Sequence, residues 1–181
     1  MGRGTPDNPR GFTLLEVVTT VAITAILLAT AIPSLGLIDA TRRATAADEA
    51  AQLFIGARSV AMGRGIAAGV VVSTSTQTLE ATQITVGGGS PGSLVDAFGE
   101  TVDPLHVPSR FPGVALTSVT LGDGGSGSGA VWFDHDGLPY LRTSSGVRGA
   151  DASADTVLTF SGGHVVRVRA HTGAVVKEAA P

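Results

Sequence analysis

The sequence contains no cysteine, which excludes disulfides, thiolate nucleophiles and metal sites built from cysteine. Charged residues make up 15% of the chain and aromatic residues 4%. The formal net charge of -3 provides no overall basic field that would attract nucleic acid. A nucleic-acid partner would therefore need a local basic patch.

Catalytic and cofactor-binding motifs are also lacking. The sequence has no phosphate-binding GxxxxGK[ST] loop, no HExxH and no recognisable serine elbow. Its four histidines, His106, His135, His164 and His171, are scattered along the chain. We therefore expect a protein that is not an enzyme and that uses no cofactor.

The hydrophobic residues, in contrast, concentrate near the N-terminus. Residues 1–10 are polar and include Arg3, Arg10 and Asp7, whereas the 27 residues from 12 to 38 contain Glu16 as their single charge. At 1.5 Å per residue, a helix of this length could cross a hydrocarbon core of about 30 Å. The pattern predicts a single transmembrane helix over 12–38, preceded by a cytoplasmic segment.

The residues before this hydrophobic segment differ from an ordinary secretory signal, in which cleavage follows the apolar stretch. Here the sequence GFTLLE, residues 11–16, resembles the processing site of type IV prepilins. The resemblance implies that 1–11 is a leader peptide, that prepilin peptidase cuts after Gly11, and that the new terminal residue, Phe12, becomes N-methylated.

Glu16 has two readings. An unpaired carboxylate deep in lipid costs several kcal/mol, so a buried Glu16 needs a positive or donor group. The resemblance implies that the α-amine of Phe12 in a neighbouring subunit supplies that group during filament assembly. The alternative is that Glu16 lies near the cytoplasmic interface and extends into the headgroups.

The predicted helix continues beyond the membrane segment, over 39–65. Pro33 removes one helical hydrogen bond, so we expect a bend there, unless it simply ends the membrane span. Farther on, apolar residues recur at spacings of three and four, which predicts a face that packs on a sheet. These residues are Ala50, Leu53, Phe54, Ala57 and Val60. Gly63 and Gly65 predict the end of the helix.

The remainder, 66–181, reads as a β-rich head. Short Val/Ile/Thr/Leu runs between glycine-rich segments are typical of an antiparallel sheet. We expect strands at 69–75, 78–86, 114–121, 130–133, 138–142, 155–160, 164–170 and 174–178, with loops at 87–92 and 122–129. The fold class is therefore α+β: a long N-terminal helix packed on an antiparallel head.

Two segments of the head refine the resemblance. VWFDHDGLPY, residues 131–140, resembles the FDPDGxP segment of the GspH/FimT family of pseudopilins and minor pilins, although His135 stands where that family has proline. The closing pattern FSGGHVVRVRAHTGAVV, residues 160–176, places Gly173 in a turn before the last strand.

Asp134, Asp136 and Gly137 allow either a cation loop or a turn. Clustered carboxylates suit calcium, but the twelfth position of such a loop is Ser145 rather than glutamate. Asp and Gly are also the residues that tight turns favour. We expect a structural turn and no metal site.

A small basic cluster near the C-terminus is the one candidate for contact with nucleic acid. It consists of Arg167, Arg169, His171 and Lys177. Alternation puts the first three on one strand face, where they could contact phosphates together. Basic side chains also protect an exposed edge strand from aggregation. The cluster lacks interleaved aromatic residues, so we do not expect nucleic acid as a partner.

The resemblance implies two functions that share the N-terminal chemistry. One is a minor pseudopilin of a type II secretion system, and the other is a minor pilin of a type IV pilus. Either would lie in the bacterial inner membrane with its head in the periplasm. Its partners would be prepilin peptidase, other pseudopilins or minor pilins, and the inner-membrane assembly platform.

Overall fold

A computed structural model describes residues 12–84, 90–96, 98–142 and 148–178, with the side chains of 30–35 excepted. The predicted leader, including Gly11, lies outside these residues. The chain divides into two units, residues 1–38 and 39–181.

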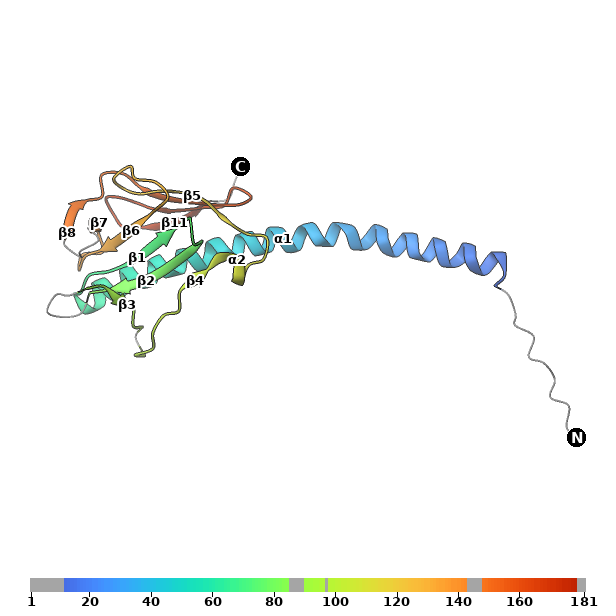
Figure 1. Ribbon diagram of the computed structural model, residues 1–181, viewed down its shortest axis with the longest axis horizontal. Coiled ribbons are helices and arrows are strands. Elements are labelled where there is room, and N and C mark those ends of the chain that lie inside the picture. The colour runs from blue at the N-terminus through green and yellow to red at the C-terminus, as the bar shows by residue number, and fades with distance from the viewer. Residues whose placement is uncertain (1–11, 85–89, 97, 143–147, 179–181) are drawn as a thin grey trace, which may run out of the picture. The chain divides into compact units, whose positions relative to one another are not determined.

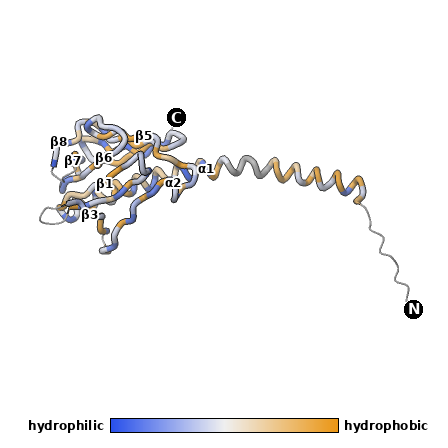
Figure 2. The backbone as a smooth tube through the Cα atoms, viewed as in Figure 1, coloured by the Kyte–Doolittle hydropathy of each residue, from blue (hydrophilic) through white to orange (hydrophobic). Residues whose placement is uncertain are grey.

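The first unit contains the beginning of helix α1, which spans Leu14–Arg64. Most of this first part of the helix is hydrophobic (Figure 2), and its large apolar side chains from Leu14 to Leu28 are exposed. No helix formed by the described residues carries an apolar stretch long enough to cross a membrane. The predicted span 12–38 includes 30–35, whose side chains are not described, and it stays a prediction.

Helix α1 is continuous through position 33. The side chain of Pro33 lies outside the described residues, so the predicted bend also stays a prediction. At its other end the helix stops as the glycines indicate. Gly65 takes a positive φ of 64°, and its N–H donates to the carbonyl of Ala61 at 3.0 Å. A left-handed glycine of this kind is a common helix end.

The second unit contains two antiparallel sheets and a short helix (Figure 1). The first sheet has the order β3-β2-β1-β6-β7-β8, with β4 also paired to β2, and the second has the order β11-β10-β9-β5. The strands of the first sheet are β1 (Ala68–Ser73), β2 (Thr78–Gln83), β3 (Gly92–Ser93), β4 (Leu105–His106), β6 (Ser128–Phe133), β7 (Pro139–Arg142) and β8 (Arg148–Asp151). Those of the second are β5 (Leu116–Thr120), β9 (Thr156–Phe160), β10 (Val165–Val168) and β11 (Val175–Glu178), and α2 spans Val107–Arg110.

The α+β prediction is confirmed, and each of the eight predicted strands corresponds to an observed one. The boundaries differ by a few residues. Strand β10 ends at Val168 rather than at 170, because the N–H of Arg169 donates to the carbonyl of Ala174 and begins the turn to β11. Strand β2 ends at Gln83 rather than at 86, and residues 85 and 86 lie outside the described chain. The predicted loop 122–129 ends early, since Ser128 and Gly129 belong to β6.

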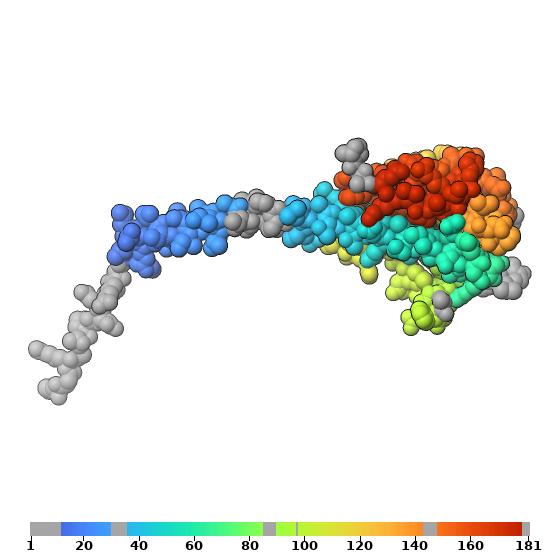
Figure 3. All heavy atoms as spheres, turned by 180° about the vertical axis from the view of Figure 1, so that it is seen from behind, coloured from blue at the N-terminus to red at the C-terminus, as the bar shows by residue number. Residues whose placement is uncertain are grey.

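One hydrophobic core joins the second part of α1 to both sheets. As predicted, Ala50, Phe54 and Ala57 are fully buried, and Leu53 and Val60 pack against the same core. Opposite them lie buried valines and leucines of β1, β2, β9 and β10. Figure 3 shows β9–β11 lying directly against this part of α1.

A smaller core, which was not predicted from the sequence, covers the other face of the first sheet. Trp132 and Tyr140 are 2% exposed and pack with Ile84. The Trp132 ring lies beside its cross-strand partner Gly69, where a Cβ would be 3.0 Å from the ring. The guanidinium of Arg142 lies 5.2 Å from the indole ring, in cation–π range.

Candidate functional site

The N-terminal motif forms the start of α1. The side-chain oxygen of Thr13 accepts a hydrogen bond from the N–H of Glu16 at 3.3 Å, and the Thr13 carbonyl accepts the same N–H at 3.0 Å. Thr13 thus caps the helix, because its hydroxyl and its carbonyl both accept an N–H of the first turn. The spacing T-x-x-E is that of a capping box, a signal that our reading of the sequence missed.

Glu16 is exposed and lies in the first turn of α1. A carboxylate in this position also interacts favourably with the positive end of the helix dipole. The hydroxyls of Thr19 and Thr20 donate to the Glu16 carbonyl at 3.0 and 2.7 Å. The geometry therefore gives Glu16 a local role in the helix, in addition to the assembly role that the resemblance implies. Phe12, the predicted methylation site, is exposed next to it.

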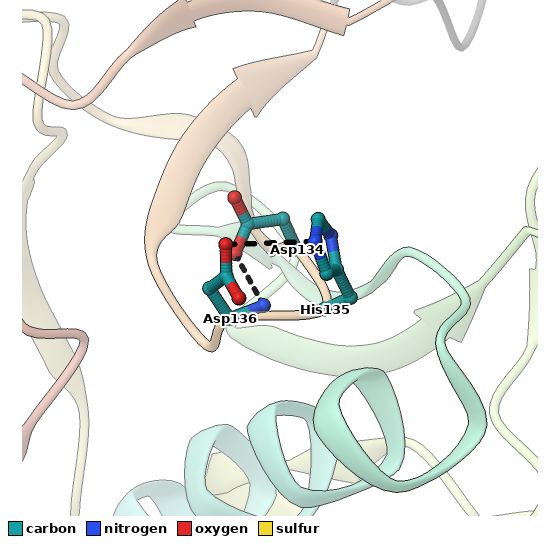
Figure 4. Close-up of side chains that lie close together, drawn as sticks. All are labelled: Asp134, His135 and Asp136. Carbon is teal, nitrogen blue, oxygen red and sulfur yellow. Dashed lines mark hydrogen bonds and ion pairs between the residues drawn. The ribbon is translucent and has the colours of Figure 1, made fainter.

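Asp134 organises the turn between β6 and β7 (Figure 4). Its Oδ1 accepts the backbone N–H groups of Asp136 at 3.0 Å and of Leu138 at 2.9 Å. The N–H of Gly137 donates to the Asp134 carbonyl at 2.9 Å, and Gly137 takes a φ of 76°. This is the arrangement of an aspartate-stabilised turn.

The same turn brings together possible metal ligands. One ligand atom from each of Asp134, His135 and Asp136 lies within 4.8 Å of the others. However, Asp134 already uses Oδ1 for two backbone donors, and its Oδ2 lies 3.5 Å from Arg148. His135 and Asp136 are exposed and lie 3.5 Å apart. The turn geometry therefore accounts for the position of Asp134 without a metal.

Arg58 of α1 connects this turn to a second one. Its Nε donates to the carbonyl of Gly137 at 3.1 Å, and its Nη2 donates to the carbonyl of Thr172 at 3.0 Å. Gly137 belongs to the β6–β7 turn and Thr172 to the β10–β11 turn, so one guanidinium joins both sheets to the helix. We call Arg58, the β6–β7 turn and the β10–β11 turn the head junction.

Glycine is needed on both sides of the head junction. Gly173 has a φ of 62°, and a Cβ at this position would overlap the Gly137 carbonyl oxygen. A Cβ on Gly137 would lie 2.7 Å from Met62 Sδ and 2.9 Å from Arg58 Nε. The two segments that carried the GspH/FimT resemblance therefore meet in space, through backbone contact. The sequence did not reveal this contact.

The basic cluster is matched by carboxylates. Arg167 makes two hydrogen bonds to Glu178, at 3.0 and 3.2 Å, and Arg169 makes one to Asp155 at 2.9 Å. Lys177 contacts Asp48 of α1. His171 is exposed and lies beyond the end of β10, rather than on the predicted strand face with the arginines. Sequence reasoning had not identified the two acidic partners of the arginines.

These ion pairs shift the pKa values of the side chains that form them. The backbone N–H of Ala170 and the guanidinium of Arg169 hold the pKa of the Asp155 carboxyl below its usual value. The Arg167 guanidinium likewise lowers the pKa of Glu178, and Glu178 raises the pKa of Arg167. The two arginines therefore stabilise the ionised forms of Asp155 and Glu178.

The histidines do not gather in one place. His106 Nδ1 lies 3.0 Å from the Ser109 hydroxyl at the start of α2, with both residues exposed. His135 lies in the β6–β7 turn, and His164 lies at the turn before β10. An exposed Ser–His contact without a water-excluding pocket is a poor basis for nucleophilic catalysis.

The chain is similar to known proteins in its N-terminal motif and in its structure. The prokaryotic N-terminal methylation motif matches residues 7–32. The minor pseudopilin EpsH from the type 2 secretion system of Vibrio cholerae has a similar structure, with a TM-score of 0.56 and 14% sequence identity, over 76% of this chain and 96% of that chain. The type IV minor pilin FimU of Pseudomonas aeruginosa PAO1 gives a TM-score of 0.47 and 12% identity, over 78% and 92%.

No curated protein matches the chain in sequence. The similarity to EpsH concerns the fold, since the sequence identity is low. The chain thus carries the prokaryotic N-terminal methylation motif of type IV pilins, and it has a pilin-like fold in which a long helix precedes an antiparallel β-head, as in EpsH.

Proposed function

We propose that this chain is a structural minor pseudopilin of a type II secretion system, and that it assembles with other pseudopilins into a short periplasmic filament that drives protein export. The observation that carries the proposal is the methylation motif at 7–32, joined to a helix with Glu16 in its first turn and to a pilin-like head. These are the parts of a subunit that is processed, anchored and assembled, rather than of an enzyme.

In this proposal, residues 12–38 hold the subunit in the inner membrane until it is extracted into the filament, with the head in the periplasm. Prepilin peptidase removes 1–11, and Phe12 then carries the new α-amine. Its pairing with Glu16 of a neighbour satisfies a carboxylate that is costly in lipid and fixes the register between helices. The inner-membrane assembly platform is the expected site of extraction.

A second candidate is a minor pilin of a type IV pilus, acting in tip assembly, adhesion or DNA uptake. One observation favours this second role: Arg167 and Arg169 lie side by side near one sheet edge, where they could contact phosphates together. Their hydrogen bonds to Glu178 and Asp155 favour the secretion role instead, because nucleic acid would have to displace both carboxylates.

A deletion strain separates the two roles. The extracellular proteome of the deletion strain would be compared with that of its complemented parent, and surface pili would be scored on the same cultures. We expect several folded exoproteins to be lost while pili remain. Normal secretion together with loss of pili, twitching or transformation would replace the proposal with the minor pilin.

The processing step has its own test. Gly11→Ala should leave a precursor longer by the leader, because the peptidase needs an unhindered residue before the scissile bond. Mass spectrometry of the N-terminus measures this, with Gly4→Ala inside the leader as the matched control. A mature chain that still begins at Phe12 would refute the leader assignment.

A further inference from the structure

Phe98 is the most exposed large apolar side chain of the described head. It is 92% exposed, whereas the next, Met62, Ile55 and Leu138, are 40–49% exposed. It lies in the segment between β3 and β4, which projects from the head in the yellow-green part of Figures 1 and 3. A fully exposed aromatic ring contributes nothing to the core, so its whole surface is available for contact with a partner.

The turn that presents Phe98 is held in shape by Asp96. Its Oδ1 accepts the N–H groups of Phe98 at 2.8 Å and of Glu100 at 2.9 Å, and its own N–H donates to the Glu100 carbonyl at 2.8 Å. Gly99 takes a φ of 88°, as such a turn requires. The guanidinium of Arg64, at the end of α1, donates to the Asp96 carbonyl. The ring is therefore presented by a preorganised turn.

An apolar groove of about 380 Å³ lies at the base of the same segment. Its walls include Leu94 and Val102, which flank the turn, and Leu53 of α1. The charges around the ring and groove are mostly negative: Asp96, Glu100, Glu49 and Asp103, against Arg64 and Arg110. Arg110 is already paired with Glu49 at 2.9 Å. The surface thus combines an aromatic knob, an apolar groove and an acidic border.

We propose that this surface docks a different pilin-like subunit, which receives Phe98 in an apolar pocket bordered by lysine or arginine. Rigid aromatic anchors of this kind carry much of the binding energy of interfaces, and a preorganised turn reduces the entropy lost on binding. Charge complementarity identifies the partner, because an acidic border selects a basic one. A second copy of this chain fits poorly, since Arg167, Arg169 and Lys177 are engaged with their own carboxylates.

The inference rests on the proposed assembly function and is tested in the native strain with the full chain. Phe98→Ala should reduce the amount of the chain in isolated filaments by about tenfold, the change expected from loss of an anchor residue. Glu100→Lys should reduce it as well, by repelling a basic border. Leu138→Ala, an exposed leucine in another turn, is the matched control and should leave incorporation unchanged. Trp132 fluorescence checks that each variant remains folded.

A photoreactive phenylalanine analogue at position 98 then identifies the partner. We expect one pilin-like subunit to be crosslinked from position 98 and not from position 138. Wild-type incorporation of Phe98→Ala, crosslinking to a second copy of this chain, or the same products from both positions would each overturn the inference. Absence of the unmodified chain from all filaments would instead refute the proposed function, so the two failures are distinguishable.

Discussion

Position 173 imposes two requirements that only glycine meets. Its φ of 62° is unfavourable for other residues, and a Cβ would overlap the Gly137 carbonyl that Arg58 binds. We predict that Gly173→Ala lowers the free energy of unfolding by about 3 kcal/mol or more, because strain and steric overlap act together. Chemical denaturation followed by Trp132 fluorescence measures the change.

The matched control for this substitution lies in α1. Gly56 is helical, and a Cβ there would meet nothing within 4 Å. Gly56→Ala should therefore stabilise the chain by about 0.5–1 kcal/mol, since alanine loses less entropy in a helix than glycine does. Equal effects of the two substitutions would show that the close contact between the two turns does not hold in solution.

Asp155 makes the stability of the head depend on pH. Its folded pKa lies below its usual value because Ala170 and Arg169 bind the ionised carboxylate. A depressed pKa contributes stability that is present above the unfolded pKa of about 3.9 and is lost as the pH falls through the lower folded value. Glu178 acts in the same direction through Arg167.

We therefore predict that Asp155→Asn unfolds more easily at pH 7 and loses less stability than the wild type between pH 5 and pH 2. Unfolding midpoints at a series of pH values measure both effects. Glu80→Gln, which changes an exposed carboxylate on β2, is the control. If the unfolding midpoint of Asp155→Asn depends on pH as that of the wild type does, the charge network of Asp155, Glu178 and the two arginines does not form in solution.

At the scale of elements, α1 and the two sheets are joined by one side chain as well as by the core. Arg58 donates to carbonyls of two turns, and lysine cannot reproduce this because its single ammonium lacks the planar fork of guanidinium. Arg58→Lys should cost about 1–3 kcal/mol, since it leaves at least one of the two carbonyls without its charged donor. Arg42→Lys, at an exposed ion pair within α1, should cost less than about 0.5 kcal/mol.

The long elements were predictable because their patterns are local. The stripe through Phe54 repeats at helical spacing over several turns, and the strands alternate between glycine-rich segments. Strands β3 and β4 have only two residues each, and β8 is exposed throughout, so none of the three has a hydrophobic pattern to detect. Backbone pairing with their neighbours defines them instead.

The contacts of the candidate sites were less accessible from the sequence. Arg58 lies 79 and 114 positions from its two partners, and Asp155 and Glu178 have no feature that marks them as partners of the arginines. Such pairs depend on the register of strands and on how the turns dock, which local propensity does not determine. The capping box at Thr13 differs, because its spacing was present in the sequence and could have been recognised.

At the scale of the whole molecule, Glu16 connects the local helix start with assembly. If its charge pairs with the Phe12 amine of a neighbour, Glu16→Gln should reach the membrane and mature normally but enter filaments poorly, because glutamine keeps the shape and loses the charge. If Glu16 acts only at the start of its own helix, Thr13→Val, which removes the capping hydroxyl, should have the same effect.

Fractionation of membranes and filaments distinguishes these two roles. We expect Glu16→Gln to lower the filament fraction by at least tenfold, since an unpaired α-amine in an apolar bundle costs more than about 1.4 kcal/mol. We expect Thr13→Val to lower it much less, and Thr24→Val, which removes another hydroxyl of α1, to leave it unchanged. Normal incorporation of Glu16→Gln would remove charge pairing from the assembly mechanism and leave Glu16 as a residue of the helix start.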